Sequence, residues 1–251
     1  NSADYRQNIE WATRAPSTEE KIAYYSDAIG IDAAEPEAYL GMIEAMEADG
    51  VFTSEEEKTL LAEIDKYPLG DGLDTNYANL AYRIGSLYWF CYAYGATDSQ
   101  LAEYSTQVAV TRMKSAIPWF DYAMTYGGEN YENYNSARVF RDIGQFNRDI
   151  TLNIEKASDG GMYRSYWENL QELVALTTGG QESNERVQLE VYRMTLYSVE
   201  RYARKFKAEE VTREEMEALC ETIRTAVDAI QIDVENEQNT LAGIKRDINS
   251  R

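Results

Sequence analysis

The sequence predicts an all-α protein built from stacked helical hairpins, and three observations lead to this prediction. Only four prolines occur in 251 residues. Apolar side chains recur at the three- and four-residue spacing of an amphipathic helix over most of the chain. Paired glycines or a proline separate these stretches, each long enough for one helix. The length suits one large helical domain or two small ones.

The stretch from Lys21 to Met46 has the spacing of a 34-residue tetratricopeptide repeat (TPR). The large, small, turn and aromatic positions of that repeat are taken by Tyr25, Ala28, Ala33 and Tyr39. The match is partial, because Lys21 stands where a small residue is usual and Ala33 replaces the turn proline. We therefore predict a TPR-like α-α superhelix, a helical-hairpin solenoid of about nine or ten helices. Regular repeats are expected in residues 1–130, and irregular C-terminal helices packed on the same solenoid in residues 131–251.

Capping signals place the helix starts in the first half of the chain. Ser17 precedes the acidic residues typical of a first helical turn. Pro36 stands at the first position of another helix, where its missing N–H costs nothing. Thr53 and Glu56 form a capping box, with Phe52 placed to pack against the helix that follows.

Breaks and apolar periodicity place the later helices. The segment Lys66–Thr75, rich in proline and glycine, is the strongest break in the first half, and a helix is expected from 76 to 94. Another is expected at about 132–156. Thr212 and Glu215 form a second capping box. The last helix starts there and is predicted to run on toward the C-terminus, either as a cap of the solenoid or as a projecting partner-binding arm.

Composition narrows the classes of partner. The 24 basic and 44 acidic residues leave a formal net charge of −20. Nucleic acids and anionic membrane surfaces need a basic footprint, so neither is an expected partner. The longest apolar run, Leu87–Tyr94, is too short to span a bilayer. A basic or neutral protein or peptide is compatible with this charge, and solubility is the alternative explanation for it.

No residue pattern in the sequence is a catalytic signature. Histidine is absent, which removes histidine-based nucleophile activation and histidine-ligated zinc. Cys91 and Cys220 lie far apart in apolar helical patterns, as buried thiols do. The acidic runs at 55–57 and 209–210 stand at helix starts, where negative charge stabilises the helix dipole. We therefore predict a non-enzyme without cofactor or metal, and a hydrolase using a carboxylate pair is the third alternative.

The aromatic content is the most informative feature, since the chain holds 20 tyrosines. Helices with aromatics on several sides either are covered on both faces or line a groove, and Tyr and Trp often supply binding energy at interfaces. Our leading hypothesis is a non-catalytic protein-interaction or sensing module; the alternative is a small-ligand or glycan receptor. Oligomeric state stays open. The candidate groove residues, for which core packing is the competing explanation, are Tyr82, Tyr88, Trp89, Tyr92, Trp119, Tyr122, Tyr126 and Tyr134.

Four segments resemble the C-terminal, non-kinase region of certain Firmicutes serine/threonine protein kinases. They are EAYLGMIEAMEADGVFTSEEEKTLL (37–61), NLAYRIGSLYWFCY (79–92), RMKSAIPWF (112–120) and MYRSYWENLQELVAL (162–176). The resemblance implies a TPR-like regulatory or sensing module, often separated from a kinase domain by a membrane helix. It carries over no site residue.

The kinase machinery is absent from this chain, which lacks the catalytic-loop histidine and an Asp-Phe-Gly motif. The chain starts at Asn1 without a methionine, and we expect it to be a piece of a longer protein. The expected location is bacterial, either as the extracytoplasmic domain of a membrane protein or in the cytoplasm.

Overall fold

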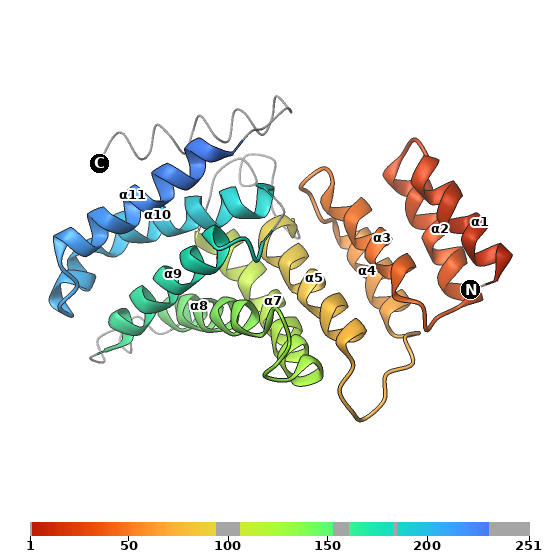
Figure 1. Cartoon of the computed structure of the whole chain (residues 1–251), viewed down its shortest axis with the longest axis horizontal. Coiled ribbons are helices and arrows are strands. Elements are labelled where there is room, and N and C mark those ends of the chain that lie inside the picture. The colour runs from red at the N-terminus through yellow and green to blue at the C-terminus, as the bar shows by residue number, and fades with distance from the viewer. Residues whose placement is uncertain (1, 94–105, 153–160, 183–184, 231–251) are drawn as a thin grey trace. The chain divides into compact units, whose positions relative to one another are not determined.

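The protein is all-α, as its sequence predicts. A computed structural model describes residues 2–93, 106–152, 161–182 and 185–230. These described residues form ten helices and no strand (Figure 1). By compactness the chain divides into two units, Asn1–Arg148 and Asp149–Arg251.

The first unit contains seven of the helices. Their order along the chain is α1 (Ala3–Arg14), α2 (Thr18–Ile31), α3 (Pro36–Glu47), α4 (Ser54–Ile64), α5 (Thr75–Cys91), α7 (Thr106–Gly127) and α8 (Tyr134–Leu152), whose last residues extend past Arg148. Helices next in sequence pack on one another from α1 to α4, α3 also packs on α5, and α5 packs on α7 (Figure 1).

The predicted helix starts in this unit are confirmed. The Ser17 side chain accepts a hydrogen bond from the Glu20 N–H at the start of α2. Pro36 occupies the first turn of α3. Thr53 and Glu56 cap one another reciprocally at the start of α4, which satisfies two N–H groups that the helix leaves without an internal partner.

Polar contacts fix α1, α3 and α5 relative to one another. The buried Tyr5 hydroxyl on α1 accepts a hydrogen bond from the Ala38 N–H of α3, at 3.1 Å. Arg6 and Glu37 form an ion pair between the same two helices. The Arg83 guanidinium of α5 lies 2.8 Å from the Glu47 carboxylate of α3. Because these contacts are directional, they fix how the three helices align along one another, which the packing of alkyl and aromatic side chains alone would not do.

Helix α5 ends at Cys91, before the predicted end at 94, because the chain then pairs with another segment. Tyr92 takes an extended backbone conformation and forms an isolated parallel bridge with Phe52. The Phe52 N–H donates to the Cys91 carbonyl at 2.8 Å, and the Ala93 N–H donates to the Phe52 carbonyl at 3.0 Å. The Phe52 ring lies against Tyr88 and Tyr92, with centroids 5.2 and 5.8 Å away. Phe52 therefore joins the end of α5 to the start of α4.

The first compact unit continues beyond residue 130, where the sequence placed a change to irregular helices. Phe140 of α8 stacks on Phe120 of α7 with ring centroids 5.1 Å apart. It also meets Trp89 of α5 at 5.1 Å. Because α8 completes this aromatic core, most of it belongs to the first unit.

The second unit is built around α9 (Met162–Thr178), α10 (Glu185–Ala208) and α11 (Arg213–Ala229). The fully buried Trp167 of α9 packs on Phe206 of α10 with centroids 5.3 Å apart. The predicted capping box of Thr212 and Glu215 starts α11. Helix α11 ends at Ala229, and Ile230 takes an extended backbone conformation, so the predicted unbroken run of this helix toward the C-terminus is wrong at Ile230; the residues after 230 lie outside the described part of the chain.

A carboxylate from a distant turn caps the start of α9. Gly161, in the N-cap position, has no side chain that could accept from the helix. Instead, the Glu209 carboxylate accepts a hydrogen bond from the Arg164 N–H in the first turn of α9. Negative charge is favoured at this end of a helix dipole, so Glu209 stabilises the packing of α9 on the α10–α11 turn.

Candidate functional site

The structure separates the eight predicted groove residues into a buried and an accessible set. The buried side chains, all in α5 or directly after it, are Tyr82, Tyr88, Trp89 and Tyr92. The side chains that keep solvent contact, all in α7 or α8, are Trp119, Tyr122, Tyr126 and Tyr134. The eight therefore do not form one continuous exposed groove.

Helix α5 buries its aromatics because helices cover it on several sides. Trp89 meets Phe140 of α8 at 5.1 Å and Phe120 of α7 at 6.1 Å. Gly85 permits the close approach of α7: a Cβ at this position would lie 2.9 Å from the Phe120 ring. The aromatic residues of α5 therefore belong to the core. Core packing was the alternative to groove lining that the sequence left open for each of them.

The hydroxyls at the end of α5 are committed to internal hydrogen bonds. Tyr88 donates to Glu57 Oε2 at 2.7 Å, and Tyr92 donates to Glu57 Oε1 at 3.1 Å. Burial, together with the hydrogen bond to the Glu57 carboxylate and its charge, holds the pKa of Tyr88 far above the usual value for a tyrosine. The carboxylate and both phenols therefore stabilise the junction of α4 and α5.

Two of the other acidic residues that the sequence raised as a catalytic possibility, Glu56 and Glu209, also have structural roles. Glu56 accepts from the Thr53 N–H in the capping box of α4. Glu209 caps α9. Each carboxylate thus satisfies a backbone N–H group at a helix start, which accounts for its position without a reaction.

The accessible aromatic side chains gather along one side of α7. Trp119, Tyr122 and Tyr126 are spaced by three and four residues and therefore share one helical face. The Trp119 and Tyr122 rings meet edge to face with centroids 5.5 Å apart, and Tyr122 is 43% exposed. A Trp–Tyr pair held in one geometry at the surface is a preformed apolar contact area.

A residue from the loop before α5 extends this surface. Leu73 is 74% exposed, the highest value among the large apolar side chains reported as exposed in the described residues. A Cβ on Gly128, which follows α7, would lie 3.4 Å from Leu73 Cδ2. The Asp74 N–H donates to the Tyr126 carbonyl at 2.9 Å and holds the loop against α7. We call Leu73, Trp119, Tyr122 and Tyr126 the α7 aromatic patch.

Buried tyrosines support the patch from below. The Tyr77 ring of α5 lies edge-on to Tyr126 with centroids 5.0 Å apart, and Tyr67 lies 5.4 Å from Tyr77. Burial raises the pKa of Tyr77 to about 12, and Tyr122, Tyr126 and Asp65 add smaller electrostatic contributions.

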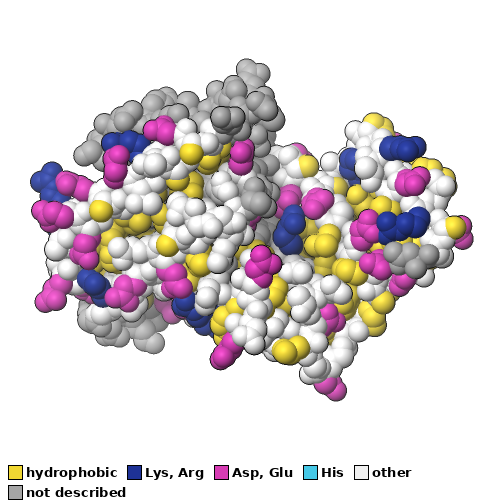
Figure 2. All heavy atoms as spheres, in the orientation of Figure 1, with side chains coloured by type: hydrophobic (Ala, Val, Ile, Leu, Met, Phe, Trp, Pro, Cys, Tyr) yellow, Lys and Arg dark blue, Asp and Glu magenta, His cyan; other side chains and the backbone are white. Residues whose placement is uncertain are grey.

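The surroundings of the patch are acidic. The Tyr67 hydroxyl contacts both oxygens of Asp74, at 3.1 and 2.9 Å, and burial followed by this hydrogen bond raises the pKa of Tyr67 to about 12. Asp65, Asp71 and Glu129 are exposed on the adjoining segments. On the visible face of Figure 2, acidic side chains are scattered over the surface with fewer basic ones among them. On the adjoining segments the exposed Lys66 is paired with Glu63, so the three exposed carboxylates are the charges there that a partner could meet.

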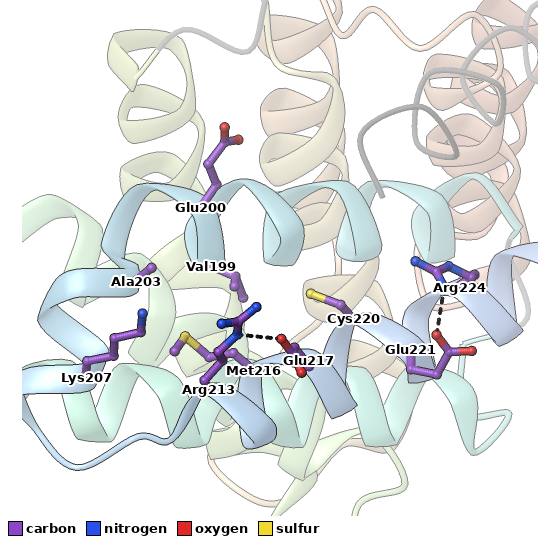
Figure 3. Close-up of a pocket in the computed structure, with 10 residues that line it drawn as sticks. All are labelled: Val199, Glu200, Ala203, Lys207, Arg213, Met216, Glu217, Cys220, Glu221 and Arg224. Carbon is purple, nitrogen blue, oxygen red and sulfur yellow. Dashed lines mark hydrogen bonds and ion pairs between the residues drawn. The ribbon is translucent and has the colours of Figure 1, made fainter. Parts of the chain in front are cut away.

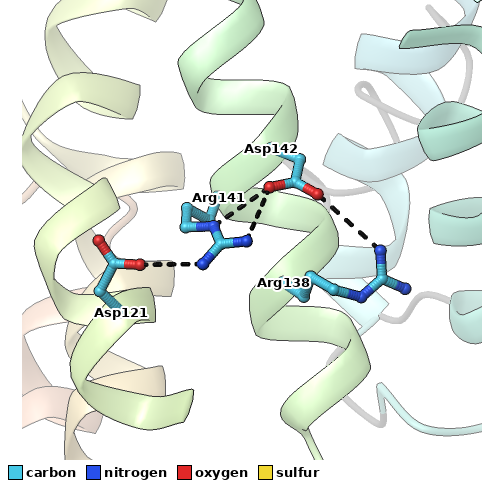
Figure 4. Close-up of polar contacts among 4 residues, drawn as sticks. All are labelled: Asp121, Arg138, Arg141 and Asp142. Atoms are coloured by element: carbon cyan, nitrogen blue, oxygen red, sulfur yellow. Dashed lines mark hydrogen bonds and ion pairs between the residues drawn. The ribbon is translucent and has the colours of Figure 1, made fainter. Parts of the chain in front are cut away.

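A charge network ties α7 to α8 beside the patch (Figure 4). The Arg141 guanidinium of α8 lies 3.3 Å from the Asp121 carboxylate of α7 and 3.0 Å from Asp142. Arg138 approaches the other oxygen of Asp142 at 3.9 Å. Burial alone lowers the pKa of Arg141, but hydrogen bonds and charges of Asp142 and Asp121 raise it above its usual value. The network orients the helix segment that carries Trp119 and Tyr122.

The described residues contain no cluster of three or more potential metal-ligating His, Cys, Asp or Glu side chains. Within the same part of the chain, no helix is long and apolar enough to cross a membrane. Comparison with known proteins found no significant match to a family model, a curated protein or a solved structure.

Sequence reasoning missed two contributors to this surface, Leu73 and Tyr77. Leu73 lies in the proline- and glycine-rich loop, where an apolar residue has no core to enter. An apolar residue in such a loop is a signal of surface exposure that the sequence did offer. Tyr77 offered no comparable signal, because its role depends on the packing of α7 against it.

Proposed function

We propose that the first unit is a non-catalytic binding module that takes a basic protein or peptide segment at the α7 aromatic patch. The observation that carries this proposal is the Trp119–Tyr122 pair, in which Trp119 is half-buried and Tyr122 is 43% exposed, on a helix whose opposite side is packed in an aromatic core. Tyrosine and tryptophan dominate binding energy at protein interfaces, because they bury large areas at a small cost in conformational entropy.

The charge around the patch supports a basic partner. The exposed carboxylates Asp65, Asp71 and Glu129 lie on adjoining segments, and the chain carries a net charge of −20. Opposite charge speeds encounter and disfavours acidic competitors. Arginine and lysine side chains also bind aromatic ring faces through cation–π attraction.

We further propose that this unit is a TPR-like solenoid. The order of helix neighbours, in which each hairpin packs on the next, supports that architecture. Two close helix approaches fall at small residues: Gly41 under the Tyr25 ring and Gly85 under the Phe120 ring. Ala28, at the small position of the repeat spacing, is fully buried. Proteins of this architecture commonly bind extended segments of other proteins.

A regulatory role beside a bacterial serine/threonine kinase is part of the proposal, supported by the four resembling segments. Reading the coding sequence upstream of Asn1 tests it. Kinase motifs followed by a membrane-spanning run would support the role of sensor or scaffold. A start codon or signal peptide directly before Asn1 would refute it.

The binding proposal is tested by titrating the whole chain with lysine- and arginine-rich peptides and with matched acidic and neutral peptides. We expect basic peptides to bind, and Trp119→Ala or Tyr122→Ser to weaken them by about tenfold or more, as for a central aromatic contact. Trp11→Ala is the matched control, since Trp11 is 47% exposed on α1, outside the patch. Equal binding of acidic peptides, or an equal loss in the control variant, would contradict the proposal.

The second candidate is a small-ligand or glycan receptor. It is favoured by the same partly exposed aromatic side chains, which have carboxylates on the adjoining segments. Tryptophan fluorescence recorded against a panel of saccharides and peptidoglycan fragments separates the two candidates. A saturable response that Tyr122→Ser removes, with no response to basic peptides, would replace the first proposal by the second.

A further inference from the structure

The second unit contains a surface pocket of about 470 Å³ between the C-terminal half of α10 and α11 (Figure 3). This volume is in the range of small-molecule sites. The pocket lies wholly among described residues of one unit, and none of them belongs to the α7 aromatic patch.

The floor of the pocket is apolar. Val199 and Ala203 contribute from α10, and Met216 and Cys220 contribute from α11. Each pair is spaced by four residues and so follows one side of its helix. Ala203 is only partly buried and carries a single methyl group, which leaves space between the two helices that a larger side chain would fill.

Most charges at the rim are paired. Arg213 Nε lies 2.7 Å from Glu217 Oε1, and Arg224 lies 2.9 Å from Glu221. Figure 3 shows the second pair at the opposite end of the pocket from Lys207, and it shows Glu200 directed away from the floor. Lys207 has no hydrogen-bond or ion-pair partner for its ammonium group among the described residues, and it lies at the end of the pocket near Arg213.

The chain segment that passes this end of the pocket is basic although the chain is strongly acidic, and two of its cations, Lys207 and Arg213, line the pocket. Residues 201–213 hold five cations (Arg201, Arg204, Lys205, Lys207 and Arg213) and two acids, Glu209 and Glu210. Glu209 is committed to the start of α9. Lysines in a last helical turn also stabilise the helix dipole, which accounts for the presence of Lys205 and Lys207 at the end of α10. The helix dipole does not account for the apolar pocket that opens beside Lys207.

We propose that this pocket binds a small amphipathic anion of the fatty-acid class. Its alkyl chain lies on the floor formed by Val199, Ala203, Met216 and Cys220, and its carboxylate pairs with Lys207. Burial of the chain supplies the nonspecific part of the affinity. The ammonium group at one end distinguishes a carboxylate from a neutral alkyl chain of the same length.

The two cysteines make the test direct. Cys220 lines the pocket and is partly exposed, whereas Cys91 is buried in the first unit, and the two form no disulfide. Octanoate is titrated into the whole chain while the rate of thiol modification at Cys220 is followed by mass spectrometry. Octanol is the neutral probe of matched length. We expect octanoate to slow the modification of Cys220, and octanol to do so only at concentrations about tenfold higher or more.

Three variants connect this protection to the pocket. Lys207→Gln is expected to weaken octanoate by about tenfold, the loss of one partly exposed charge-assisted hydrogen bond. Arg204→Gln is the matched control on the same helix, outside the lining, and is expected to leave octanoate binding unchanged. Ala203→Leu fills the floor and is expected to abolish protection by both probes. Circular dichroism confirms that each variant is folded.

Several outcomes would overturn the proposal. These are no protection by octanoate, equal protection by octanol, and unchanged octanoate binding in folded Lys207→Gln. Protection of Cys220 by an amphipathic acidic peptide, with none by octanoate, would assign the pocket to a protein partner instead.

Discussion

Helices α5 and α7 are both rich in aromatic residues, yet the structure uses them in opposite ways. Tyr82 and Trp89 of α5 are 6% and 4% exposed, whereas Tyr122 of α7 is 43% exposed. Helix α5 is packed against both α3 and α7, and Phe140 of α8 covers its far end. Helix α7 keeps one face without such cover. The number of aromatic residues in a helix therefore does not tell which of them are buried; the position of the helix among its neighbours decides which rings keep solvent contact.

The largest expected effect comes from removing a ring at the centre of α5. Trp89→Ala should reduce the free energy of unfolding of the first unit by about 3–5 kcal/mol, since it removes contacts to Phe120 and Phe140 and leaves a cavity. Tyr122→Ala should cost clearly less, because 43% of this residue is already exposed and its removal leaves no enclosed cavity. Urea denaturation followed by circular dichroism measures both. Equal losses would contradict the assignment of α5 to the core and α7 to the surface.

A smaller effect is expected where α5 and α7 approach most closely. In Gly85→Val the new Cβ would lie 2.9 Å from the Phe120 ring, and the required shift should cost about 1–3 kcal/mol. Gly30→Ala in α2 is the control, since nothing lies within 4 Å of its added Cβ. Alanine is also the better helix former, so this variant should be stabilised by about 0.5–1 kcal/mol. Thermal unfolding that shifts down in both variants would argue against a close contact specific to Gly85.

The third effect is a pH dependence that separates buried from solvated tyrosines. Burial raises the pKa of Tyr77 from 10 to about 12 in the folded protein, while the unfolded chain loses this proton near pH 10. The contribution of Tyr77 to stability is thus fully present below pH 10 and is lost as pH rises toward 12. Urea unfolding between pH 9 and 12 should show falling stability, with a shallower decline in Tyr77→Phe. An identical decline in that variant would contradict the burial of this hydroxyl in the folded state.

Local signals in the sequence predicted the helices well. The capping boxes at Thr53 and Thr212 and the proline at Pro36 mark helix starts that the structure confirms. Each depends on contacts within one helical turn, so a short window of sequence contains all the information. The all-α class followed from the same local patterns.

Features that depend on contacts far apart in the sequence were not predictable in this way. The early end of α5 comes from the pairing of Tyr92 with Phe52, and the cap of α9 comes from Glu209 in a later turn. For the same reason, the predicted groove included four residues of α5 and its end that are in fact buried. Tyr88 and Tyr122 are the same residue type on helices of similar pattern, but Tyr88 is covered by Phe52 and hydrogen-bonded to Glu57, both far away in the sequence, whereas Tyr122 has no such cover.

The central claim is that a basic partner docks on the open face of α7, and photo-cross-linking tests it most directly. A lysine- and arginine-rich peptide with one photoreactive side chain is bound to the whole chain, irradiated and mapped by mass spectrometry. The account predicts cross-links at 119–126 and in the loop around Leu73, lost in Tyr122→Ser. Cross-links concentrated at Trp11 on α1, or on helices α9 to α11, would contradict it.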